Sequence, residues 1–486
     1  MWSDNDMPSH SRPTSAGAGR FNRITAGALL AVLVAGATLS AEDWPQWRGA
    51  ERLGIWTETG ILREFPDEGL IVKWRAPVGG GFAGPAVADG RVFVLDYAET
   101  DPRTMDGNER ILALDEESGE VLWTRAWATT YRMLMFSYAS GPRATPTVDG
   151  GRVYLTGAAG RIFCLDAATG AVIWEKDTRA EYNAYVPVWG TSVAPLVDGD
   201  RVIFVVGGEP DALVMAFDKH TGEELWRALE PRTEMGYSQT TIIEAGGAPQ
   251  LIVWHPWGLS SLDPATGALH WEEPFPGGQA PIADPVRSDE YLLVSGFYTG
   301  SMMMRLSADR PDATLLWRDE GSDRILEDGV EVAEADGLHS NITTPLVVGD
   351  YIYGIGSHGH VRALRKDTGE RVWEAEGLTT RNRWGSAHFV RHEDRYFVYN
   401  ENGELIIARF TPEGYDEIDR TRLLNPTSRT GYGPSRPGSR SRRRHGQSDR
   451  LVVWAHPAFA NRHVVVRNDE EIIRVSLDET DYLGAR

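Results

Sequence analysis

The chain has 486 residues, of which 24% are charged and 41% hydrophobic, a composition that excludes both a disordered chain and a polytopic membrane protein. Its 70 acidic and 49 basic residues give a net charge of −21, which repels phosphate backbones and argues against a nucleic-acid partner. A single cysteine, Cys164, excludes an internal disulfide, a multi-cysteine zinc site and an iron–sulfur cluster.

Residues 1–41 have the pattern of an export signal. Arg20 and Arg23 precede a run of small and apolar residues at 26–39, which is too short to span a bilayer as a helix. We expect cleavage near Ala41, and an uncleaved N-terminal anchor is the alternative. No cysteine follows the run, so there is no site for a bacterial lipid anchor, and no later segment is apolar enough to span a membrane. We therefore expect a periplasmic or secreted protein without an integral membrane segment.

A repeat of roughly 45 to 56 residues runs through most of the chain. Its clearest part is an eleven-residue pattern in which a small or apolar residue leads through Asp and Thr-Gly to Trp, as from Cys164 to Trp174. The Asp carboxylate can accept hydrogen bonds from the tight turn, and Gly supplies the positive φ that the turn needs. Trp then lies on an outer strand against the neighbouring unit. The expected docking residues are Trp74, Trp123, Trp174, Trp226, Trp271, Trp317 and Trp373.

Each period reads as four short strands, for example 144–148, 152–156, 161–165 and 171–175. Periods of this length are typical of propeller blades, and the first turn of the unit occurs eight times. The last unit, at 464–477, lacks an outer strand with a tryptophan, whereas the strand at 71–75 carries Trp74 one period before Trp123. We therefore predict an all-β, eight-bladed propeller of four-stranded antiparallel blades at 71–486, closed by this N-terminal strand and preceded by an extension at 42–70.

These motifs resemble the tryptophan-docking repeat of pyrroloquinoline-quinone (PQQ) proteins, which quinoprotein alcohol dehydrogenases and BamB-type outer-membrane assembly lipoproteins share. The segment Asp-Trp-Pro-Gln-Trp-Arg-Gly at 43–49 is similar to the start of many secreted bacterial members with no assigned role. For the dehydrogenases, the resemblance implies PQQ, Ca²⁺ held by acidic and amide side chains, a catalytic Asp and a disulfide between adjacent cysteines. Cys164 stands alone, no such acidic cluster aligns, and the lipidated cysteine of BamB is absent.

Candidate site residues lie on the connections that converge at one end of the propeller channel. Trp189 and Trp384 each precede a Gly and an inner strand, so they either stack a planar ligand or act as lids. Arg143 and Arg383 either attract an anionic ligand, such as a tricarboxylate quinone, or form salt bridges at the rim. The candidate cofactor-binding residues are Trp189, Trp384, Arg143, Arg383, Tyr237, His339 and Asn341.

A metal site is the weaker hypothesis for this end of the channel. His358 and His360 alternate on an expected strand, so they share a face and could bind a metal with His339, or simply meet solvent. We assign no metal ligand and no catalytic residue.

Two stretches interrupt the repeat. Residues 319–336 form an acidic insert, interpreted as a solvated loop or a partner contact. Residues 428–450 hold seven Arg among Ser, Pro and Gly, which is typical of a flexible loop, and contact with an anionic partner is the alternative.

The leading function hypothesis is an exported, non-catalytic scaffold that binds a protein partner or a small molecule at the channel face. It needs no cofactor, although PQQ with Ca²⁺ remains open. One alternative is a divergent PQQ-dependent dehydrogenase that oxidises alcohols or sugars, and another is a BamB-like outer-membrane protein assembly factor.

Overall fold

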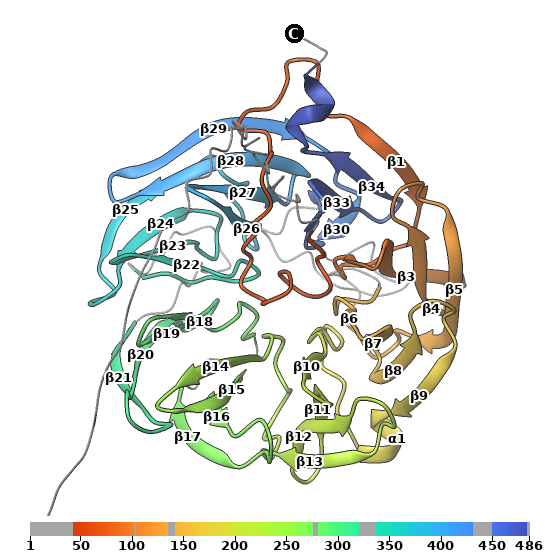
Figure 1. Ribbon diagram of the computed structural model, residues 1–486. Helices are drawn as coiled ribbons and strands as arrows, with labels where there is room; N and C mark the ends of the chain where they lie inside the picture. Colours follow the sequence, from red (N-terminus) through yellow and green to blue (C-terminus); the bar gives the residue numbers. More distant parts are fainter. Residues whose placement is uncertain are drawn as a thin grey trace, which may run out of the picture. The chain divides into compact units, whose positions relative to one another are not determined.

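The computed structural model describes residues 42–101, 104–134, 141–275, 280–319, 337–430 and 450–483, all within the compact unit Ser40–Arg486. The expected export signal and most of the stretches 319–336 and 428–450 lie outside the described residues. The described chain forms a ring of eight four-stranded antiparallel sheets around a central channel (Figure 1). The predicted eight-bladed β-propeller is therefore confirmed.

Seven blades consist of four consecutive strands that run from the channel outward (Figure 1). Blade 1 contains β2 (Ala86–Ala88), β3 (Arg91–Asp101), β4 (Asp106–Asp115) and β5 (Val121–Thr130), and blade 2 contains β6 (Thr147–Asp149), β7 (Arg152–Thr156), β8 (Arg161–Asp166) and β9 (Val172–Asp177). Blade 3 contains β10 (Leu196–Asp198), β11 (Arg201–Gly208), β12 (Ala212–Asp218) and β13 (Glu224–Ala228), and blade 4 contains β14 (Thr241–Ala245), β15 (Ala248–His255), β16 (Gly258–Leu262) and β17 (Leu269–Pro274). Blade 5 contains β18 (Val286–Ser288), β19 (Tyr291–Gly296), β20 (Gly300–Leu306) and β21 (Ala313–Arg318). Blade 6 contains β22 (Leu346–Val348), β23 (Tyr351–Ile355), β24 (Val361–Arg365) and β25 (Arg371–Ala375), and blade 7 contains β26 (Ala387–His392), β27 (Arg395–Asn400), β28 (Glu404–Thr411) and β29 (Gly414–Arg422).

The eighth blade joins the two ends of the described chain. Its inner strands are β32 (Ala458–Ala460), β33 (His463–Arg467) and β34 (Glu471–Ser476), and its outer strand is β1 (Val72–Pro77). Strand β1 pairs antiparallel with β34, from Val72 opposite Val475 to Pro77 opposite Glu471. The N-terminal strand thus closes the ring as predicted, because it gives the last blade its fourth strand.

The remaining described elements are small. They are helix α1 (Thr178–Tyr182), the 3₁₀ helix η1 (Glu479–Tyr482) and a two-stranded sheet of β30 (Ser428–Thr430) and β31 (Arg450–Val452). The ends of the predicted loop at 428–450 are therefore paired strands. No described helix is long and apolar enough to cross a membrane.

Tryptophans of the outer strands dock on the glycine of the next blade's turn. The ring of Trp123 lies so close to Gly170 that a Cβ there would come within 2.5 Å of it, and its Nε1 donates to the Ala167 carbonyl at 3.1 Å. Glycine is thus required both for its φ of +69° and for the absence of a side chain. The other such pairs are Trp74 on Gly119, Trp174 on Gly222, Trp226 on Gly267 and Trp317 on Gly369.

Two docking tryptophans depart from this arrangement. Trp373 donates to the Thr411 carbonyl of the next blade at 3.0 Å. In that blade Glu413 stands where the repeat has Thr, and Gly414 has no described side chain packed against it. Trp271 instead donates to Gln250 Oε1 of its own blade at 2.8 Å. The reason lies in blade 5, whose turn at 307–313 contains no glycine on which Trp271 could dock.

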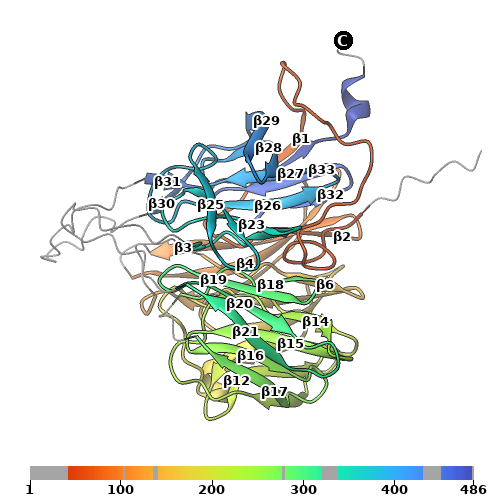
Figure 2. The same ribbon diagram turned by 90° about the vertical axis from the view of Figure 1, so that its left-hand side faces the viewer.

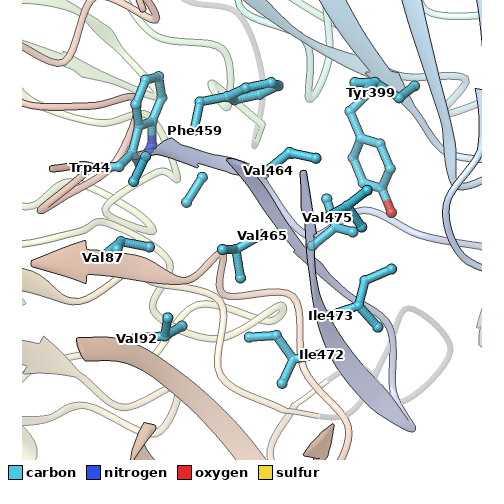
Figure 3. Packing of buried hydrophobic residues seen from close by; sticks show 14 of the residues in the cluster. Trp44, Val87, Val92, Tyr399, Phe459, Val464, Val465, Ile472, Ile473 and Val475 are labelled. Atoms are coloured by element: carbon cyan, nitrogen blue, oxygen red, sulfur yellow. The ribbon is translucent and has the colours of Figure 1, made fainter. Parts of the chain in front are cut away.

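The N-terminal segment, residues 42–62, lies across one face of the ring, and β30 and β31 lie on the other (Figure 2). Trp44 and Trp56 of the segment are each 1% exposed and belong to the apolar cluster shared by blades 7, 8 and 1. Figure 3 shows Trp44 beside Phe459 of β32, and their ring centroids are 5.9 Å apart. The predicted extension at 42–70 is therefore packed into the propeller over much of its length.

Candidate functional site

An aromatic cavity of about 130 Å³ lies in the channel, where the segments that precede several inner strands converge. Its walls are built mainly from Trp47, Phe82, Trp189, Tyr237, Trp384 and Trp454, with Ile282 and Ile342. Polar lining comes from Arg143, Ser192, Gln239, Asn341 and His388. Five of the seven candidate residues, Trp189, Trp384, Arg143, Tyr237 and Asn341, line this cavity.

The aromatic rings support one another at close range. Trp384 is 8% exposed and stacks on Phe297, with centroids 4.3 Å apart and planes 19° apart. Trp189 meets Trp384 edge-on at 6.0 Å and Tyr237 at 5.3 Å. The Tyr237 hydroxyl donates to Glu234 Oε2 at 2.9 Å, and burial raises the pKa of Tyr237. These contacts fix the wall in one arrangement.

The two candidate arginines occupy different positions. Arg143 lines the cavity with its guanidinium over the Phe82 ring, 5.4 Å from the centroid, and burial lowers the pKa of Arg143 to about 10. Arg383 is not among the lining residues. It lies over the rings of Phe297 and Trp384 at 5.0 and 5.2 Å and donates to the Tyr298 hydroxyl at 3.2 Å. Arg383 therefore supports the wall from behind.

His339 also lies outside the cavity lining, fully buried, with Nδ1 3.2 Å from the Phe297 carbonyl. The expected strand position of His358 and His360 is wrong, because both residues lie in the turn between β23 and β24. Gly359 in this turn has a φ of +89°, which a strand does not allow. Within the described part of the chain, no group of three or more His, Cys, Asp or Glu side chains is placed to hold a metal ion.

Asn341 has a buried amide that nothing in the described structure satisfies. The residue is 1% exposed, and neither Nδ2 nor Oδ1 has a hydrogen-bond partner among the described residues. By contrast, the neighbouring Gln239 accepts from the Ala194 amide at 2.6 Å and donates to the Ser192 carbonyl at 3.1 Å. Burying an unsatisfied polar group costs roughly 1–3 kcal/mol, so a ligand that offers a donor and an acceptor to Asn341 would recover this energy.

The other eight lining residues were not anticipated as site residues; they are Trp47, Phe82, Ser192, Gln239, Ile282, Ile342, His388 and Trp454. Trp47 comes from the N-terminal segment, and its Nε1 donates to Asp284 Oδ2 at 2.7 Å. His388 Nε2 lies 3.0 Å from the Trp454 carbonyl, and burial lowers the pKa of His388 to about 4. The only signal for Trp47 in the sequence was its place in the motif at 43–49.

The calcium ion that the resemblance to dehydrogenases implies does not fit this cavity. Ca²⁺ takes six to eight oxygen ligands, usually including carboxylates, whereas the described lining contains no carboxylate. The amide oxygen of Gln239 is already engaged, which leaves Asn341 as the free amide. The aromatic walls and Arg143 fit a planar ring with a polar or anionic group, without a cation.

Comparison with curated proteins gives partial similarities of two kinds. The chain is 30% identical to the quinoprotein ethanol dehydrogenase of Pseudomonas aeruginosa over 150 residues, which is 28% of this chain and 24% of that protein. It is 22% identical to the outer membrane protein assembly factor BamB of Yersinia pestis over 315 residues, or 64% of this chain and 75% of that protein. The match thus spans about a quarter of the length of the alcohol dehydrogenases.

Solved structures show the same fold. BamB from Moraxella catarrhalis superposes with a TM-score of 0.51 at 14% identity, covering 84% of this chain and 99% of that one. Quinohemoprotein alcohol dehydrogenase from Comamonas testosteroni superposes with a TM-score of 0.56 at 14% identity, covering 90% and 80%. The family model described as outer membrane protein assembly factor BamB matches residues 107–375, more than half of the chain. The protein therefore belongs to this family of PQQ-repeat propellers.

Proposed function

We propose that the protein is an exported, non-catalytic propeller that binds a small molecule in the aromatic cavity. The observation that carries this proposal is the Asn341 amide, whose donor and acceptor are both buried at the cavity without a partner among the described residues. Native proteins satisfy nearly all buried polar groups, and an exception at a cavity wall is typical of a ligand contact.

The lining defines the chemistry of the ligand. Trp189, Trp384 and Trp454 favour a flat or apolar body, and Asn341 favours a neutral group with adjacent donor and acceptor atoms, such as a carboxamide. A non-catalytic role is supported by the described lining, which offers neither a carboxylate nor a thiol. His388 is held at the Trp454 carbonyl with a pKa near 4, so it is a weak base.

A pair of matched probes tests the proposal by saturation-transfer NMR. Benzamide carries a ring and a carboxamide, whereas fluorobenzene carries the ring alone. We expect the wild-type protein to bind both, and the variant Asn341→Leu to retain fluorobenzene and lose benzamide. Equal benzamide signals from the two proteins, or none from either, would contradict a ligand role for Asn341.

A divergent PQQ-dependent dehydrogenase that oxidises alcohols or sugars is the second candidate, favoured by the partial matches to quinoprotein dehydrogenases. Trp189, Trp384, Arg143 and Asn341 would contact the quinone. Titration with PQQ, with and without Ca²⁺, followed by reduction of an artificial electron acceptor with alcohols, tests it. We expect no reduction, because the cavity fits no calcium ion.

A role resembling that of BamB is the third candidate, supported by similarity over 64% of this chain. It predicts that the protein co-purifies with outer-membrane proteins after detergent extraction. A protein recovered alone and wholly in the soluble fraction would count against it.

A further inference from the structure

A second cavity, of about 820 Å³, adjoins the aromatic cavity along the channel. Trp47 and Gln239 line both cavities and so lie between them. The second cavity runs beside β14, β18 and β22, the inner strands of blades 4 to 6, and beside residues 47–55 of the N-terminal segment. It is thus bounded on one side by sheet edges and on the other by a chain that already lies across the channel.

The register of the blades shows what these edges offer. In every blade the inner strand turns into the next strand through two residues, as from Val348 to Tyr351. The closing pair of such a hairpin is hydrogen-bonded, so the residue before it directs its backbone N–H and C=O away from the sheet and toward the channel. These residues are Val87, Val148, Val197, Glu244, Arg287, Val347, Arg391 and Phe459.

The N-terminal segment binds three of these positions. Trp44 exchanges two backbone hydrogen bonds with Val87 in blade 1, both of 2.9 Å, and the Val148 amide of blade 2 donates to the Pro45 carbonyl at 2.8 Å. In blade 7, the Arg391 amide donates to the Gly54 carbonyl at 2.7 Å, and the Arg391 carbonyl accepts from the Trp56 amide at 2.8 Å. An extended chain that pairs with successive inner edges is therefore already part of this molecule.

The corresponding positions of blades 4 to 6 carry no such chain. The backbone groups of Glu244, Arg287 and Val347 have no partner on their channel side within the described ranges, and all three residues line the second cavity. The Asp284 carboxylate lines it too: Oδ2 accepts from Trp47, whereas Oδ1 is buried and has no partner among the described side chains. The cavity is thus lined by unpaired backbone N–H and C=O groups of the described sheet edges. It is also lined by a carboxylate oxygen, Asp284 Oδ1, that can accept a hydrogen bond from an N–H group.

Apolar side chains border the same space. Leu53, Ile55 and Val348 are 57%, 38% and 38% exposed, and all three line the second cavity. Positive and negative side chains are balanced in its lining, which contains Arg48, Arg52, Arg287 and Arg391 together with Glu51, Glu244, Asp284 and Asp289. The lining therefore suits a chain of low net charge with apolar residues at alternate positions.

We propose that an extended segment of another polypeptide binds in the second cavity and continues the edge pairing of the N-terminal segment onto blades 4 to 6. The segment adds backbone hydrogen bonds at Glu244, Arg287 and Val347 and directs an N–H group to Asp284 Oδ1. This is strand addition, in which main-chain bonds give affinity and alternate side chains give selectivity. The site is separate from the aromatic cavity and does not depend on the function proposed for it.

The test uses the full-length protein and a fluorescein-labelled peptide of three Thr-Val repeats with blocked ends. Its partner is the same peptide N-methylated at every residue, which keeps the side chains and removes the N–H donors. We expect the unmodified peptide to raise fluorescence anisotropy and the methylated one to bind at least about tenfold more weakly. Equal binding of the two peptides, or no binding up to about 1 mM, would overturn the proposal.

Two proline variants locate the site, because residues 345–350 and 195–200 have almost the same sequence in two different blades. Residues 345–350, Pro-Leu-Val-Val-Gly-Asp, line the second cavity, except for Asp350, and residues 195–200, Pro-Leu-Val-Asp-Gly-Asp, do not. Proline is tolerated where an edge N–H faces away from the sheet, so both variants keep their blade. We expect Val347→Pro to weaken peptide binding at least about tenfold, and Val197→Pro and Asn341→Leu to leave it unchanged. Wild-type affinity in a folded Val347→Pro protein would refute this placement.

Discussion

Replacing Asn341 by leucine should make the free protein more stable while removing ligand binding. Asn341 is 1% exposed, and both polar atoms of its side chain lack partners within the described ranges. Leucine is close to asparagine in shape and has no polar atom, so the substitution removes an unsatisfied group and buries apolar surface. Most core substitutions of a polar residue destabilise, and this one is expected to do the opposite.

The magnitude follows from the cost of the unsatisfied amide. One buried donor or acceptor without a partner costs roughly 1–3 kcal/mol, so Asn341→Leu should raise the free energy of unfolding by about that amount. Asn400 provides the matched control, because it is fully buried and fully bonded. Its Nδ2 donates to the Leu378 carbonyl at 3.0 Å and to Glu404 at 2.8 Å, and its Oδ1 accepts two backbone amides. Asn400→Leu leaves those groups unpaired and should cost at least about 2 kcal/mol.

Guanidinium chloride unfolding followed by circular dichroism at pH 7 measures both variants against the wild type. The midpoint should move up for Asn341→Leu and down for Asn400→Leu, with similar slopes. A fall for Asn341→Leu as large as that for Asn400→Leu would refute the reasoning, because it would mean that the Asn341 amide is satisfied in the free protein.

The remaining predictions concern ring closure, pH and the docking glycines. Trp74→Ala should cost about 3–5 kcal/mol, measured by the same unfolding assay, because Trp74 carries the contact that closes the ring; a change below about 1 kcal/mol would contradict this. The pKa of His388 in the folded protein is about 4, below the ordinary value of 6.5. The contribution of neutral His388 to the free energy of unfolding is therefore complete above pH 6.5, and it falls by up to about 3 kcal/mol toward pH 4. His388→Gln should therefore lose less stability than the wild type between pH 7 and pH 5, and parallel pH profiles would contradict this assignment. Gly170→Ala forces a Cβ against the Trp123 ring, whereas Gly199→Ala has similar φ and open space, so the first should lower the thermal midpoint clearly more than the second.

The fold was predictable because the docking motif repeats a local physical requirement. Each Asp-x-x-Thr-Gly turn forms its own hydrogen bonds, and the Trp that follows it docks on the glycine of the next blade's turn. Five well-kept copies therefore predict both the blade and its contact with the next blade. The same logic explains Trp271, since the loss of glycine in the following turn was visible in the sequence. The strand assigned to His358 and His360 was wrong because the turn at 356–359 has the same spacing of glycines as the turn at 157–160, and its signal was overlooked.

The candidate site was only partly predictable. Trp189, Trp384 and Asn341 precede inner strands, so topology alone brings them to one end of the channel. Trp47 could not be placed in this way, because its segment pairs with sheet edges through backbone groups, which carry no side-chain period. Arg383 and His339 lie on the right connections, but cation–π and hydrogen-bond contacts hold them behind the wall. Which side of a wall a side chain takes depends on packing that no local pattern encodes.

The closure between β1 and β34 also determines the order in which the molecule is completed. Val72 pairs with Val475, about 400 positions later, so the first strand synthesised waits for the last. Until then the N-terminal segment has edges of blades 1 and 2 to pair with, but Trp44 lacks Phe459 and the ring is open. This contact has a very high sequence separation, so closing it carries a larger loop-entropy cost than any strand pairing within blades 1 to 7. A chain without blade 8 has no partner strand for β1, so the closed ring depends on both ends of the described chain at once.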